Sequence, residues 1–99
     1  MDPAEIDRAA LEIAARLHQE PAEVQQAYRY LFARVAEEAG ILEPIGHEIR
    51  ESGERHVYRE PASGAFYAVD RPHEWSIADE QTYLAQMKQL LPGLASSSD

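Results

Sequence analysis

Two histidines, His47 and His56, are the residues whose type and spacing come nearest to a metal or acid–base site. They flank a turn signal at Ser52-Gly53, and strand alternation would place them on one face of neighbouring strands. A zinc site needs three or four converging ligands, and the HxH and HExxH spacings that often supply them are absent from the sequence. Histidines that bond to tyrosine hydroxyls or to backbone explain the pair as well. We therefore predict no metal and no other cofactor, and keep His47 and His56 as weak metal candidates.

Other catalytic residue types form no recognisable pattern. Acidic pairs such as Glu37-Glu38 and Asp79-Glu80 do not mark a pocket, and a chain of 99 residues seldom builds a deep substrate cleft alone. Nucleophile–base arrangements are recognised in space rather than by sequence spacing. The prediction is a non-enzymatic protein, and a small His-based metal protein or enzyme remains an alternative.

A second pattern resembles the helix-turn-helix of DNA-binding proteins. Its apolar positions are matched by Ile13, Ala14, Leu17, Pro21 and Val24, and residues 39–43 with Gly53, Arg55, Val57 and Tyr58 resemble the wing of a winged helix. The resemblance implies a transcriptional regulator in which Gln25, Gln26 and Arg29 face the DNA groove. His18 stands where the motif usually has glycine, and no lysine occurs before Lys88.

The net charge of −9 favours a different kind of partner. A protein this acidic is repelled by phosphate backbones and anionic membranes and attracted to basic surfaces. We therefore predict a protein partner with a basic surface, and expect neither nucleic acid nor a membrane; a homodimer is left open. The N-terminus lacks the regions of a signal peptide and no apolar run could span a bilayer, so we expect a cytoplasmic protein.

Four residues are predicted to contact that partner. Exposed tryptophan, tyrosine and arginine are the usual anchors of protein interfaces. Trp75 precedes a helix and Tyr30 falls outside the apolar stripe of its helix, while Phe66 and Arg59 fall on the outer face of the predicted sheet. Burial of Trp75 over the sheet edge is an equal alternative. The predicted role is that of an accessory, adaptor or inhibitor protein.

Three helices and three strands must position these residues. Apolar residues recur at helical spacing over 3–17, 21–39 and 77–91, with capping signals at Asp2 and Ser76 and a glycine stop at Gly40. Residues 44–72 alternate and contain two turns, which predicts a β-meander. The predicted fold is α+β, with two N-terminal helices, a three-stranded antiparallel meander and a C-terminal helix packed on one sheet face. We expect one domain over 1–94 and a disordered tail over 95–99.

The turns also predict a strand register. If Ser52-Gly53 forms the first hairpin loop and 61–64 the second, the cross-strand pairs include Ile49 with His56, His47 with Tyr58, Tyr58 with Tyr67, His56 with Val69, and Arg55 with Asp70. The predicted core face then holds Ile45, His47, Ile49, His56, Tyr58, Tyr67 and Val69. The same register sets Arg50 opposite Arg55, a repulsion that counts against it.

Overall fold

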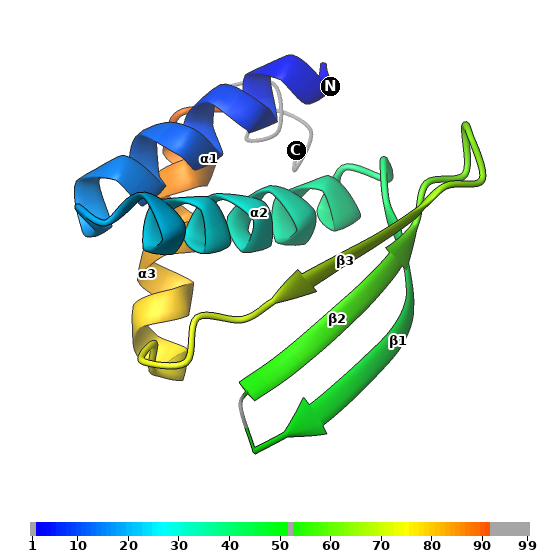
Figure 1. Ribbon diagram of the computed structural model, residues 1–99. Helices are drawn as coiled ribbons and strands as arrows, with labels where there is room; N and C mark the ends of the chain where they lie inside the picture. Colours follow the sequence, from blue (N-terminus) through cyan, green and yellow to red (C-terminus); the bar gives the residue numbers. More distant parts are fainter. Residues whose placement is uncertain (1, 52, 92–99) are drawn as a thin grey trace.

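The fold is the predicted α+β arrangement (Figure 1). A computed structural model describes residues 2–51 and 53–91. Its elements are α1 (Pro3–Leu17), α2 (Pro21–Glu38), β1 (Glu43–Arg50), β2 (Gly53–Arg59), β3 (Phe66–Asp70) and α3 (Ile77–Gln89). The strands form one antiparallel sheet in the order β1-β2-β3. The predicted tail at 95–99, and the last residues of the predicted domain, lie outside the described residues.

The helices begin and end at the residues that the sequence indicates. The carboxylate of Asp2 caps α1 by accepting the N–H of Ala4 at 3.0 Å, and Pro3 occupies the first helical position. Ser76 and Asp79 cap the start of α3 reciprocally. Gly40 adopts a φ of +77° just after α2, a conformation that glycine reaches without strain. These local signals determine the residues at which the helices begin and end.

The core forms where the three helices meet, and α2 joins them to the sheet. α2 contacts α1, α3 and β3, whereas α3 packs mainly against α1 and α2 (Figure 1). Among the fully buried side chains are Ile6, Ile13, Leu31, Val35 and Met87. All helices therefore lie on one side of the sheet, but α2 is the one that covers it most. Within the described residues, every helix is too short or too polar to cross a bilayer.

The second hairpin has the predicted register. Tyr58 lies opposite Tyr67, and Arg55 lies opposite Asp70. The guanidinium of Arg55 donates two hydrogen bonds to the Asp70 carboxylate, at 2.9 and 3.4 Å. The cross-strand ion pair that we predicted is therefore confirmed.

The first hairpin is displaced by two residues from its predicted register. The observed pairs include His47 with His56, Ile49 with Glu54, Glu48 with Arg55, and Arg50 with Gly53. Gly53 thus belongs to β2, where its φ of +131° suits glycine. Because Glu48 rather than Arg50 lies opposite Arg55, the expected repulsion becomes an attraction. The predicted register was wrong, and the charges along the strands favour the observed one.

A displacement of two residues preserves which face each side chain occupies, because side chains alternate. His47 and Ile49 therefore still share the helix side of the sheet with Tyr58 and Val69. The prediction that this face is buried along its whole width was wrong for β1, all of which is exposed. Val69 is 2% exposed but Ile49 is 77% exposed, since α2 covers β3 and does not extend over β1.

Ile45, also predicted to be core, is 48% exposed. A bulge between Pro44 and Gly46 interrupts the ladder at this residue. The strand alternation on which the prediction depended therefore stops at Gly46.

Candidate functional site

Three potential metal ligands, His47, Glu54 and His56, lie together on the helix side of the β1–β2 hairpin. Strand alternation puts Glu54 and His56 on one face of β2, and strand pairing sets His47 opposite His56. Nε2 of His47 lies 3.1 Å from Oε1 of Glu54. The imidazole rings of His47 and His56 stack with their centroids 4.5 Å apart. One ligand atom from each residue lies within 4.8 Å of the other two, and we call this group the His–Glu cluster.

Sequence reasoning found the two histidines and missed Glu54. The predicted register put Glu54 beside the hairpin loop, away from His47, so no third ligand converged with them. The usable signal was the spacing of Glu54-x-His56, which places two ligands on one face of a strand in any register. The structure supplies the third ligand by setting His47 across from His56.

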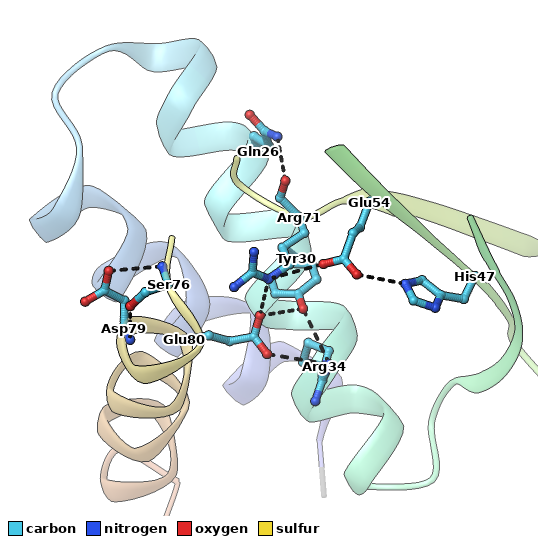
Figure 2. A network of polar contacts seen from close by, with 9 residues as sticks. All are labelled: Gln26, Tyr30, Arg34, His47, Glu54, Arg71, Ser76, Asp79 and Glu80. Carbon is cyan, nitrogen blue, oxygen red and sulfur yellow. Dashed lines mark hydrogen bonds and ion pairs between the residues drawn. The ribbon is translucent and has the colours of Figure 1, made fainter. Parts of the chain in front are cut away.

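Arg71 connects the His–Glu cluster to the protein interior (Figure 2). Its Nε lies 3.6 Å from Oε2 of Glu54 and donates to Oε1 of Glu80 at 2.7 Å. Glu80 also accepts a hydrogen bond of 2.7 Å from the Tyr30 hydroxyl, and its Oε2 lies 3.7 Å from Nη1 of Arg34. The side chains of Arg71 and Glu80 are only 15% and 14% exposed. We call Tyr30, Arg34, Arg71 and Glu80 the Glu80 network.

The Glu80 network holds Glu80 ionised and Tyr30 protonated. Burial by itself raises the pKa of Glu80, but hydrogen bonds from Arg71 and Tyr30, with the charge of Arg34, lower it below the ordinary 4.5. Burial and the hydrogen bond to Glu80 raise the pKa of Tyr30. The phenol therefore donates a hydrogen bond to an ionised carboxylate throughout the physiological pH range.

His56 is the member of the His–Glu cluster closest to the core. Burial lowers the pKa of its imidazole, and the neighbouring His47 lowers it further. Its ring meets the Tyr30 ring edge-on, with centroids 5.5 Å apart. Nε2 of His56 is buried and has no hydrogen-bond partner among the described residues. A neutral imidazole with an unbonded ring nitrogen is suited to bind an ion or a polar group.

Two of the four predicted partner contacts are core residues. Tyr30 is 1% exposed, so the exposure predicted for it was wrong; Glu80 accepts a hydrogen bond from its hydroxyl, which allows the whole side chain to be buried. Trp75 is 5% exposed, in agreement with the burial alternative. Its ring packs edge-on against Tyr30 and Tyr83. Neither residue offers an exposed anchor to a partner.

The other two predicted contacts lie at the surface. Phe66 is 72% exposed at the start of β3. Arg59 is half-exposed and its Nη1 lies 3.4 Å from Oε2 of Glu43 on β1. Both are accessible, and Arg59 is already paired with an acid of its own chain.

The residues predicted to contact DNA face the sheet. Gln25, Gln26 and Arg29 line an open groove between α2 and β3. Arg29 donates to the backbone carbonyl of Ala68 at 3.1 Å, and its guanidinium lies 5.0 Å from the centre of the Tyr67 ring. α1 and α2 run side by side as an antiparallel hairpin (Figure 1), whereas the two helices of a DNA-binding helix-turn-helix cross at a wide angle. This arrangement does not favour insertion of α2 into a DNA groove.

Most of the nine cationic side chains pair with carboxylates of the same chain. The pairs are Arg16 with Glu12, Arg34 with Glu80, Arg50 with Glu48, Arg55 with Asp70, Arg59 with Glu43, Arg71 with Glu54 and Glu80, and Lys88 with Glu38. Few positive charges are left to meet phosphates, and the net charge of −9 comes from the acids in excess of these pairs.

A scan of protein-family models and searches of curated proteins and of solved structures found no match to this chain.

Proposed function

We propose that this chain acts by binding another protein, in an accessory, adaptor or inhibitor role, and that the partner adds an extended segment to the edge of β1. The observation that carries the proposal is β1 itself: it is the first strand of the sheet, and all eight of its residues are exposed. In strand addition, main-chain hydrogen bonds supply affinity and alternate side chains supply specificity.

The backbone direction of β1 supports strand addition. The carbonyl of Glu54 accepts the N–H of Arg71 at 2.9 Å, so the backbone groups of Glu54 point toward the β3 side of the sheet. Ile49 lies opposite Glu54, and in an antiparallel ladder its own N–H and C=O must then point away from β2. The same alternation turns the backbone of His47 outward. The backbone N–H and C=O groups of His47 and Ile49 are therefore both available to hydrogen-bond a partner strand.

The side chains of β1 indicate which half of the strand is used. Pro44 lacks an N–H and the bulge between Pro44 and Gly46 bends the strand, and both features protect an edge from pairing. The segment from His47 to Arg50 lacks both. It also presents Ile49 on the helix side, where α2 does not cover it.

The overall charge indicates the chemistry of the partner. Since most cations are paired internally, the net charge of −9 attracts a segment rich in lysine or arginine. An apolar residue on the same face of the incoming strand would pack against Ile49. The proposed partner segment therefore alternates apolar and other residues and carries basic side chains.

A displayed library of random peptides tests this proposal. We expect selected peptides to combine alternating apolar residues with lysine or arginine, and to shift the backbone amide NMR signals of residues 47–50. Ile49→Arg should weaken binding by at least about tenfold through charge repulsion and loss of the apolar contact. Ile77→Arg is the matched control, because Ile77 is 73% exposed and Ile49 is 77% exposed.

Two results would overturn the proposal. One is a set of peptides whose binding shifts amides on the helices and leaves residues 47–50 unchanged. The other is equal binding to the native chain and to Ile49→Arg. Both variants replace exposed side chains, so circular dichroism should show an unchanged fold in each.

A further inference from the structure

We propose that the His–Glu cluster binds a divalent transition-metal ion of the zinc type, with His47, Glu54 and His56 as the protein ligands. Imidazole nitrogen and carboxylate oxygen are both ordinary zinc ligands. Three protein ligands leave one coordination position for water or for a group from outside. This inference goes beyond the proposed partner binding and does not depend on it.

The hairpin already holds the ligands near coordination distance. Bonds of about 2.0–2.1 Å place the ligand atoms of a tetrahedral site about 3.4 Å from one another. In the hairpin, Nε2 of His47 lies 3.1 Å from Oε1 of Glu54, and a ligand atom of His56 lies within 4.8 Å of both. Side-chain rotations would have to close the remaining distance. Strand pairing holds the backbone of all three residues in place.

Arg71 orients the carboxylate ligand from outside the cluster. It approaches Oε2 of Glu54, while Oε1 of the same carboxylate faces His47. One oxygen is thereby left for the metal, an arrangement typical of outer-shell partners that fix ligand orientation. Arg71 is also bound to Glu80 at 2.7 Å, and this second carboxylate reduces the repulsion between the guanidinium and a bound cation.

The buried nitrogen of His56 is the second observation that indicates a ligand. A buried polar atom without a hydrogen bond is costly, and native proteins seldom leave one unexplained. Nε2 of His56 is such an atom within the described part of the chain. The His56 ring packs edge-on against Tyr30 of α2 on one side and stacks on His47 on the other, and neither contact supplies a hydrogen bond to this nitrogen. Coordination through Nε2 would satisfy this nitrogen, and a metal ion bound by His47 and His56 would tie β1 to β2.

Zinc titration of the full chain tests the proposal. Zn²⁺ is added in a chelator-free buffer at neutral pH, with calorimetry and thermal unfolding as readouts. We expect one ion per chain and a melting temperature that rises with zinc concentration. His47→Gln and Glu54→Gln should each weaken binding by at least about tenfold. His73→Gln, at an exposed histidine outside the cluster, should leave binding unchanged.

A spectroscopic readout separates coordination from a general effect on folding. On zinc addition, the imidazole NMR signals of His47 and His56 should shift while those of His73 stay in place. His47 is half-exposed, so His47→Gln should fold normally and lose the response. Zinc binding that survives at full strength in His47→Gln, or that is lost in His73→Gln, would overturn the proposal. So would the absence of heat and of any change in melting temperature up to about 1 mM Zn²⁺.

Discussion

β3 and β1 are the two outer strands of one sheet and have opposite surroundings. On β3, Val69 is 2% exposed, and Tyr67 packs against Phe32 and the guanidinium of Arg29, both from α2. On β1, Ile49 faces the same side of the sheet and is 77% exposed. In both strands, successive side chains point to opposite faces of the sheet. The difference shows that alternation selects the face of a side chain, whereas burial depends on whether a helix reaches it.

The contrast extends to polar side chains. Glu80 and Arg71 lie near the covered side, and each is largely buried with several partners. Glu48 and Arg50 on β1 form an ion pair of 2.6 Å in solvent. Exposed pairs of this kind contribute little to stability, whereas breaking a buried pair leaves a charge uncompensated. Substitutions on the covered side should therefore change stability more than substitutions on the exposed side.

The largest expected effect follows from removing the charge of Glu80. Glu80→Gln leaves Arg71 and Arg34 without their shared buried carboxylate, and we expect the free energy of unfolding to fall by about 2–3 kcal/mol. Urea denaturation measures the change. Glu74→Gln, at an exposed acid just before α3, is the control and should be nearly neutral. Equal losses in the two variants would contradict the role given to the Glu80 network.

The next effect is a dependence of stability on acid. The folded-state pKa of Glu80 is lowered, so its contribution is complete above the ordinary value of 4.5 and is lost as pH falls through the lowered folded-state pKa. Unfolding free energies measured from neutral pH down to about pH 3 should decline, and the decline should be smaller in Glu80→Gln. Asp70→Asn allows the same measurement at an exposed carboxylate, because the hydrogen bond from Arg55 also lowers the pKa of Asp70. An unchanged decline in Glu80→Gln would show that other carboxylates cause it.

A smaller effect is expected from truncating the covered strand. Val69→Ala removes two methyl groups from a buried position, and we expect a loss of about 1–2 kcal/mol in unfolding free energy. Thermal or urea unfolding measures it. A neutral result would mean that α2 packs on β3 less closely than the structure shows.

The smallest effect should come from the exposed strand. Ile49→Ala removes more atoms than Val69→Ala, yet we expect a change within about 0.5 kcal/mol, because Ile49 is already in water. A loss as large as that of Val69→Ala would show that β1 is covered in solution, for instance by a second copy of the chain. Unfolding measured at several protein concentrations would then reveal the association.

The sequence predicted the features that depend on near neighbours. The fold class, the element order, the caps at Asp2 and Ser76, and the register of the second hairpin all follow from local patterns. The first hairpin was misplaced because Ser52-Gly53 was taken as its loop. The expected repulsion between Arg50 and Arg55 was the available clue, and the observed register removes it.

Features that depend on distant residues could not be predicted. Tyr30 has the position of a surface residue on its own helix, and it can be buried because Glu80 of α3 accepts a hydrogen bond from its hydroxyl. Burial of the sheet face was overestimated at Ile49 because the sequence does not state how far α2 extends across the strands. The His–Glu cluster needed the correct register before Glu54 could be set beside His47.

The Glu80 network also has a consequence for the order of folding. The hydrogen bond between Tyr30 and Glu80 joins residues 50 apart in the chain, whereas the α1–α2 hairpin and both β-hairpins close over short loops. Closing a long loop costs more chain entropy. Contacts between residues this far apart therefore form late, unless contacts between nearer residues have already brought them together. The network would then be absent from the transition state, and its strength would set how fast the native protein unfolds rather than how fast it folds. We therefore expect Glu80 to slow unfolding by holding α3 against α2.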